Sequence, residues 1–491
     1  MPKSKQFLKE PKKKSKHATP VPTNSDEYLA AGVDFEEAGE KWRGGDAVKS
    51  TRFFVRALDC YEEGLKKFPD SFDLAYNNCR TGLQYEITQH PKIVENLPGT
   101  LLELLQTALD SSRYALKLDP EDADALFTLA SLLTDFAETK VSNNPSDKLQ
   151  EALWLFERCL KRQVGTFKEE NAALGDLAPK DVDMGEGDSA AGPPFPTKEE
   201  AWARVVEPTT KEILLETIVA KLETLSKLAE ETDPRDGDSI SYISDYYKDT
   251  IRRKYLKPLC EATSTDSSSF PDTLKLAIAN YQCAVANLSY SARRIDLQQY
   301  EQVVQTAYNT LKPSSDPQEL PSNPQVLCDY AESIIAFQNA VKELGLNHNP
   351  YLTQRWLALT EALKSLTVAG AMKDVKHREQ IQLMRGDVEM MRFQLGEGPG
   401  QLAASQKNRE ALLGNSKKFY DGSRRISINN GAKEREIEAR IKLDVVDAFI
   451  GDNTTLLEAK ATLESFEAVL TEAISDGVVT KEQLLRLGLE G

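Results

Sequence analysis

The chain has few residues of the kinds that build catalytic or metal sites. Only four of its 491 residues are histidines, and only six are cysteines. The histidines lie far apart and no two cysteines have the C-x2-C spacing, so we expect no metal site and buried, reduced thiols. The sequence also has no G-x4-G-K-[ST] phosphate loop, no G-x-S-x-G elbow, and no HExxH or kinase signature. These absences predict a protein that is not an enzyme and uses no cofactor.

Long apolar runs are missing as well. No stretch of about 18 apolar residues occurs, so the sequence predicts no membrane span. The N-terminus is basic but has no apolar segment of the kind found in secretory signal peptides. No stretch alternates polar and apolar residues as a half-buried strand does, whereas amphipathic helical runs fill most of the chain. The sequence therefore predicts an all-α fold.

Charge is distributed unevenly along the chain. Residues 1–20 contain seven lysines and one glutamate, a net charge of +6, while the whole chain carries −16, which leaves −22 for the remainder. Such an acidic body repels nucleic acid and attracts basic segments of proteins. In the tail, Lys12, Lys13, Lys14 and Lys16 form a short basic cluster typical of nuclear import, although a cluster like this can also serve solubility or contact nucleic acid briefly. We expect the protein in the nucleus and cytoplasm.

Composition divides the chain into five parts. Residues 1–25 are polar and lack helical periodicity, which predicts a disordered basic tail. Residues 26–166 are predicted to form helical repeats, and residues 167–206, rich in Gly, Pro, Asp and Glu, a flexible acidic linker. Helical periodicity returns over residues 207–475, and residues 476–491 are expected to form a short C-terminal helix or tail.

The most specific pattern lies early in the chain. Ala57, Tyr61, Gly64 and Pro69 have the spacing A-x3-Y-x2-G-x4-P. A small residue admits a partner helix, an aromatic residue one turn later fills the gap beside it, the glycine keeps the next helix close, and the proline ends the helix. This pattern resembles the second helix of a tetratricopeptide repeat. The resemblance implies a right-handed solenoid of helix pairs that presents a surface to another protein.

Diverged copies of the same pattern follow. The terminal prolines of the first two copies, Pro69 and Pro120, stand 51 positions apart (120 minus 69). The family repeat is about 34 residues long, so we expect an insertion around residues 90–98. For the first helix of the first repeat we expect Ala38–Trp42 to form the contact with the second helix. The further copies are Ala108, Ser112 and Ala115, then Ala152, Phe156 and Cys159, then Ala277, Tyr281 and Ala284.

The resemblance also suggests where a partner binds. Tetratricopeptide domains use the groove lined by their first helices, and one subgroup clamps a carboxylate terminus of heat-shock chaperones with Lys and Arg in the third repeat. In this sequence the first helix of the third repeat starts with acidic residues, which would repel a carboxylate and attract a basic segment. The same acids could instead stabilise helix N-terminal turns. The expected partner-binding residues are Tyr76, Asn77, Glu121, Asp122, Asp124 and Phe127.

These observations predict a non-enzymatic interaction protein. Its acidic repeats and basic tail resemble in architecture the histone-binding tetratricopeptide chaperones and the dedicated escorts of ribosomal proteins. The resemblance implies a chaperone or escort that binds a basic, Lys/Arg-rich client protein in nuclear or ribosomal assembly. The alternative is a scaffold or adaptor subunit of a multiprotein complex, which would bind through apolar helical faces around residues 242–255 or 356–366. The sequence leaves the client and the oligomeric state open.

Overall fold

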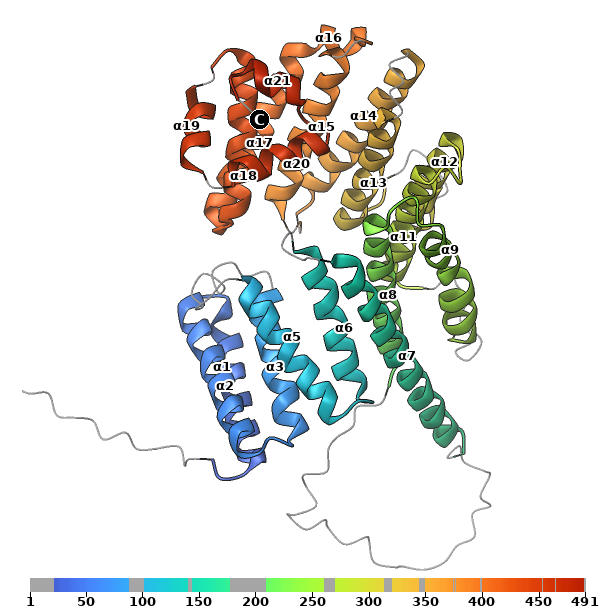
Figure 1. The fold of residues 1–491 in the computed structure, drawn as a ribbon, viewed down its shortest axis with the longest axis vertical. Helices are drawn as coiled ribbons and strands as arrows, with labels where there is room; N and C mark the ends of the chain where they lie inside the picture. Colours follow the sequence, from blue (N-terminus) through green and yellow to red (C-terminus); the bar gives the residue numbers. More distant parts are fainter. Residues whose placement is uncertain are drawn as a thin grey trace, which may run out of the picture. The chain divides into compact units, whose positions relative to one another are not determined.

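The computed structural model describes residues 22–87, 101–139, 144–176, 209–259, 270–312, 320–343, 349–373, 375, 377–397, 400–452, 454–463 and 465–489. Every regular element in these ranges is helical, which confirms the all-α prediction (Figure 1). The helices belong to two compact units, Met1–Pro120 and Glu121–Gly491. Within the described ranges, no helix combines the length and apolar character that crossing a lipid bilayer requires.

The first unit consists of two helix pairs. Helix α1 packs along α2, and α3 packs along α5, while α2 also contacts α3. Side-chain caps mark where the first pair begins: Asn24 accepts a hydrogen bond from the Glu27 amide at 2.8 Å, and Asp46 accepts one from the Lys49 amide at 2.9 Å. The helices are α1 (Ser25–Arg43), α2 (Ala47–Lys67), α3 (Phe72–Ile87) and α5 (Leu101–Leu118).

The A-x3-Y-x2-G-x4-P spacing has the packing role that the sequence predicts. Ala57 and Tyr61 are completely buried on α2. A Cβ atom added to Gly64 would lie 3.0 Å from the Tyr28 Cβ and 2.9 Å from the Leu74 Cδ1, so only glycine lets α1 and α3 approach α2 this closely. The α2 helix ends at Lys67, just before the proline.

The first-helix contact differs in part from the expected one. The Tyr61 ring lies on Gly32, where an added Cβ atom would overlap the ring, and its hydroxyl donates a hydrogen bond to the Glu36 carboxylate at 2.5 Å. Within the expected Ala38–Trp42 segment, Gly39 does meet the Phe54 ring, but Trp42 is 38% exposed. Tyr61 therefore packs against Gly32, the glycine nearer the start of α1, and not within the expected segment.

The second unit contains the remaining helices. In chain order they are α6 (Ala123–Glu138), α7 (Pro145–Asp176), α8 (Lys211–Glu231), α9 (Gly237–Tyr246), the π-helix η2 (Tyr247–Leu256), α11 (Asp272–Ser291), α12 (Leu297–Ala307), the 3-10 helix η4 (Asn309–Leu311), α13 (Pro324–Glu343), α14 (Asn349–Ala371), α15 (Arg378–Glu397), α16 (Ala403–Lys407), α17 (Arg409–Asn430), α18 (Lys433–Ile450), α19 (Thr454–Thr462), α20 (Phe466–Ser475) and α21 (Lys481–Arg486). The main contacts run between near neighbours in this order, such as α6 with α7, α13 with α14, and α15 with α17. Stacking of this kind confirms a helical solenoid.

Two boundaries differ from those expected from composition. Helix α7 continues to Asp176, into the range predicted as the acidic linker, and it packs against α8, which follows that range. The helices on either side of the acidic segment thus share one unit, and the division at Pro120 falls inside the predicted repeat region. The rest of the predicted linker, the basic tail up to residue 21 and the insertion around residues 90–98 lie outside the described residues.

A buried polar network joins α15, α17 and α18. The Lys442 ammonium lies 3.0 Å from carboxylate oxygens of both Asp387 and Glu438, and the Tyr420 hydroxyl donates to Asp387 at 2.8 Å. Burial disfavours the charge on Lys442, but the two carboxylates outweigh burial and hold its pKa above the ordinary value. The Tyr420 ring covers Gly386, where an added Cβ atom would overlap it, just as Tyr61 covers Gly32.

We expect Gly386→Ala to destabilise the second unit. The new methyl group meets the Tyr420 ring, and such overpacking costs about 1–3 kcal/mol even though alanine favours helices. Gly414→Ala in α17 is the matched control, because nothing lies within 4 Å of its added Cβ atom. The free energy of unfolding of this variant should rise by about 0.5–1 kcal/mol. Guanidinium unfolding of the whole chain measures both, and equal midpoints for the two variants would contradict the packing role of Gly386.

Candidate protein-binding groove

Two of the sequence-predicted binding residues lie on α3 in the first unit. The Tyr76 ring stacks on the Phe72 ring at a centroid separation of 5.8 Å. The Asn77 side chain donates a hydrogen bond to the Asp73 carbonyl at 2.8 Å, one turn earlier in the same helix. Both residues thus make contacts within α3, and whether they also bind a partner stays a prediction.

The other four predicted residues gather at the start of α6 in the second unit. Asp122 caps this helix by accepting from the Ala125 amide at 2.9 Å. The Glu121 carboxylate lies 3.1 Å from the Arg158 guanidinium of α7. The structure brings together Glu121, Asp122, Asp124 and Phe127, and the Phe127 ring meets the Phe156 ring edge-on at 5.7 Å. The capping and pairing of the first two acids show the stabilising role that was the alternative interpretation. The targeting residues Lys12, Lys13, Lys14 and Lys16 lie outside the described residues.

A larger group of acidic side chains lies farther along the second unit. It combines side chains of α6, α8 and α13, and we call it the acidic groove. Within it, Lys227 of α8 forms an ion pair with Glu138 of α6. The carboxylates of the acidic groove are Asp135 and Glu138 of α6, Glu223 and Glu230 of α8, and Asp329 and Glu332 of α13.

Two of these carboxylates lie at the surface beside other protein groups. Glu223 and Glu230 are exposed, yet the surrounding protein raises the pKa of both carboxyl groups against the opposing effect of Lys227. Nearby protein thus limits the water that can solvate each charge, and neighbouring carboxylates disfavour the charge further.

Two carboxylates in the acidic groove have strongly shifted pKa values. Burial raises the pKa of Asp135 to about 6, and neighbouring Glu138 and Glu223 add to the effect while Lys227 opposes it. Burial, together with Asp329 and Glu230, raises the pKa of Glu332 to about 7. Lys227 offsets the four carboxylates of α6 and α8, whereas Asp329 accepts hydrogen bonds from Asn280 and Gln325, each at 2.6 Å. The like charges of the group repel one another, and a cationic ligand would relieve this repulsion.

Local sequence explains how each helix contributes to the acidic groove. Residues three or seven positions apart share a helix face, as do Asp329 and Glu332, or Glu223 and Glu230. A buried hydrogen bond of 3.0 Å between the hydroxyls of Thr134 and Thr224 holds α6 against α8. Sequence analysis missed these acids because their spacing on each helix is ordinary, and only packing brings the three helices together.

A second candidate surface lies on α7, α9 and η2. The Glu157 carboxylate accepts hydrogen bonds from the Lys221 ammonium at 2.6 Å and from the Tyr255 hydroxyl at 2.7 Å. Burial opposes this charge, but Lys221 and the hydrogen bonds from Lys254 and Tyr255 together outweigh burial and lower the pKa of Glu157 to about 2. Nearby on the same helices, Trp154 is 58% exposed and Tyr242 is 49% exposed. Large exposed aromatic residues next to a π-helix are typical of functional surfaces.

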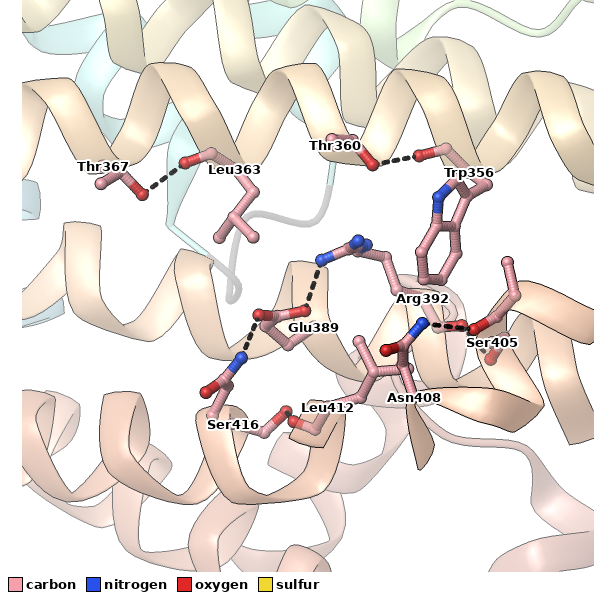
Figure 2. Close-up of polar contacts among 12 residues, drawn as sticks. Trp356, Thr360, Leu363, Thr367, Glu389, Arg392, Ser405, Asn408, Leu412 and Ser416 are labelled. Carbon is pink, nitrogen blue, oxygen red and sulfur yellow. Dashed lines mark hydrogen bonds and ion pairs between the residues drawn. The ribbon is translucent and has the colours of Figure 1, made fainter. Parts of the chain in front are cut away.

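The other apolar face expected to bind partners is largely used inside the fold. Figure 2 shows the Trp356 ring beside the Arg392 guanidinium, whose carbon lies 4.1 Å from the ring centroid. Arg392 pairs with Glu389 at 2.8 Å, and Glu389 also accepts from Asn415 of α17 at 2.9 Å. Trp356 therefore stabilises the contact between α14 and α15, and the segment 356–366 leaves Leu357 as its exposed large apolar side chain.

Comparisons with known proteins reveal relatives but no family. No model of a protein family matches the chain. The chain is 24% identical over 432 residues to the UPF0656 protein C926.02 of Schizosaccharomyces pombe, which covers 83% of this chain and 86% of that protein. It is also 33% identical over 87 residues, 17% of the chain, to the protein YNL193W of Saccharomyces cerevisiae, of which this match covers 15%. A solved circular tandem repeat protein aligns with 95% of this chain and 99% of its own, at 13% identity and a TM-score of 0.28.

We expect the acidic groove to make stability depend on pH. A carboxyl group whose folded pKa is raised contributes stability below its unfolded pKa, and this contribution disappears as the pH rises through the folded pKa. For Glu332 the ordinary value is 4.5 and the folded value about 7, so wild type loses stability between these pH values. Glu332→Gln removes this loss and should be more stable than wild type at pH 8. Because Glu332 is exposed and water screens its charge, we expect a gain of about 0.5–1 kcal/mol.

The measurement is urea unfolding of wild type and Glu332→Gln at pH 5.5 and pH 8. The stability difference between the two proteins should grow in favour of the variant as the pH rises. A difference that stays constant, or that favours wild type at pH 8, would show that Asp329 and Glu230 do not destabilise the charge on Glu332.

Proposed function

We propose that this protein is a non-enzymatic binding module that holds a Lys/Arg-rich segment of a client protein in the acidic groove. We further propose that it acts as a chaperone or escort of that client in nuclear or ribosomal assembly. The observation that carries the proposal is a group of six carboxylates: the four of α6 and α8 lie around Lys227, and those of α8 interact with Asp329 and Glu332 of α13. Such a surface binds cationic segments through charge and excludes anionic ones.

The raised pKa values support the acidic groove over the start of α6 as the binding site. At the start of α6, Glu121 is paired with Arg158 and Asp122 caps the helix, so these acids already have partners. In the acidic groove, burial raises the pKa values of Asp135 and Glu332, and neighbouring carboxylates raise them further. A cationic ligand gains most where negative charge is least compensated. The tetratricopeptide assignment remains part of this proposal, supported by the packing of Ala57, Tyr61 and Gly64.

We expect a fluorescent peptide of alternating Lys and Ser to bind the full-length protein, and to bind more weakly as sodium chloride rises from 50 to 500 mM. The double variant Asp135→Asn/Glu223→Gln should raise its Kd by about tenfold or more, because two close charges of the groove are lost. Fluorescence anisotropy measures both effects.

Two controls change the net charge equally. Glu410→Gln/Glu467→Gln removes two exposed acids of α17 and α20 and should leave the Kd nearly unchanged. Glu121→Gln/Asp124→Asn tests the start of α6. If this variant loses binding and the Asp135→Asn/Glu223→Gln variant keeps it, the client binds at the start of α6 and not in the acidic groove. If all three double variants lose binding equally, the effect is one of net charge and not of a specific site.

The exposed aromatic residues favour a second function, that of a scaffold or adaptor subunit. Trp154 and Tyr242 are the exposed aromatics of α7 and α9, and Tyr242 lies against Tyr246 with ring centroids 5.2 Å apart. Tryptophan and tyrosine at such positions are frequent energetic centres of protein interfaces. This surface uses different helix faces from the acidic groove, so the same molecule can bind a client and a second protein.

We expect Trp154→Ala/Tyr242→Ala to lose partners from the purified complex while the basic peptide still binds. Tagged wild-type and variant proteins are recovered from cells and compared by quantitative mass spectrometry. Leu357→Ala, which truncates a side chain that is 62% exposed on α14, is the control and should leave the partners unchanged. Identical partners for all three proteins would exclude a scaffold role of this surface.

A further inference from the structure

A cavity of about 480 Å³ lies between the start of α13, the start of α15 and α18. Its size is within the range of sites that enclose a small ligand or a long side chain. Glu332 lines this cavity, and the same carboxylate interacts with Asp329 and Glu230 of the acidic groove. The cavity, which we call the pocket, therefore shares the Glu332 carboxylate with the acidic groove.

The lining of this pocket is apolar along one part and acidic at another. Cys328, Ile381 and Met384 contribute sulfur and aliphatic surface. Glu332 and Glu379 contribute carboxylates, of which Glu379 is already engaged, since it accepts from the Asn430 amide at 3.2 Å. A long cationic side chain needs this combination, because its methylene groups prefer apolar surface and its charged end prefers a carboxylate.

One buried acceptor in the pocket lacks a donor. The Gln380 side-chain oxygen accepts no hydrogen bond within the described residues. Glu332 is exposed to solvent, and no cation is among the groups that shift its pKa. The arginine that lines the same pocket, Arg435, is paired with Glu438 of its own helix at 2.6 Å. A buried acceptor without a donor is uncommon in folded proteins and calls for an explanation, such as a bound ligand.

We propose that this pocket holds one lysine or arginine side chain of the client as an anchor. Its methylene groups lie along Ile381 and Met384, and its charged end donates hydrogen bonds to Glu332 and to the Gln380 oxygen. The inference rests on the proposed function and deepens it. The acidic groove attracts the basic segment, and the pocket fixes which residue of the segment binds where. Other basic residues of the client stay in the open groove, where water reaches them.

The test uses the full-length protein and a nonapeptide of serines with lysines at positions 2, 5 and 8. Single replacement of each lysine by norleucine, which keeps the methylene groups and removes the charge, should reveal one position with a loss of at least about tenfold and smaller losses at the other two. Replacement of that lysine by arginine tests which cation the pocket accepts. Replacement by acetyl-lysine, which is neutral, should weaken binding as norleucine does.

Three variants assign the anchor to the pocket. Glu332→Gln should make the three lysine positions equivalent, and its expected gain in stability separates lost binding from lost folding. Met384→Lys places an ammonium of the chain itself beside Glu332, so it should block the anchor and leave the weaker groove binding. Glu223→Gln, in the open groove, should weaken every peptide by a similar factor and keep the preference for one position.

The outcomes distinguish the two proposals. If wild type binds no basic peptide at any salt concentration, the proposed function fails. If wild type binds and Asp135→Asn/Glu223→Gln weakens binding, but the three lysine positions are equivalent in wild type, only the pocket is refuted. An unchanged preference in Glu332→Gln and Met384→Lys would also overturn the anchor.

Discussion

The close approach of paired helices at glycine, beneath a tyrosine ring, is the contact on which this solenoid depends. It occurs in both units, where Tyr61 covers Gly32 and Tyr420 covers Gly386. Each tyrosine also donates its hydroxyl to a carboxylate of the glycine-bearing helix, Glu36 and Asp387 respectively. Ring and hydrogen bond together set the separation and the register of the two helices, because neither partner can shift without losing contact area or a buried hydrogen bond.

Helices held at such distances can support a surface that lowers their own stability. The acidic groove places like charges together where burial already raises the pKa values of Asp135 and Glu332. Elsewhere in the same unit, buried charges are compensated, as Lys442 is by Asp387 and Glu438, or Glu157 by Lys221. The contrast between compensated and uncompensated charge separates side chains that stabilise the fold from those poised for a ligand.

Much of the local structure was predictable from short-range patterns. The helical region predicted from residue 207 starts with α8, and the short helix expected within residues 476–491 is α21; threonine side chains cap both helices. The acids at the start of α6 were also found, but the sequence could not choose between a cap and a ligand site, since Asp122 suits both. The pairing of Tyr61 with Gly32 was missed because α1 has two glycines, Gly32 and Gly39, that lie seven residues apart, and only the packed structure shows which one meets the tyrosine.

The sequence by itself determined the helical class, the role of Ala57, Tyr61 and Gly64, and the acidic character of the body. These properties follow from composition and from contacts within one or two turns, which a linear pattern records. Only the tertiary structure decided where the acids converge. Long stretches of chain separate the acids of α6, α8 and α13, yet Asp135 interacts with Glu223, and Glu230 with Glu332, once these helices have packed into the solenoid. Electrostatic interaction depends on distance in space, so the surface that attracts a ligand exists only after folding.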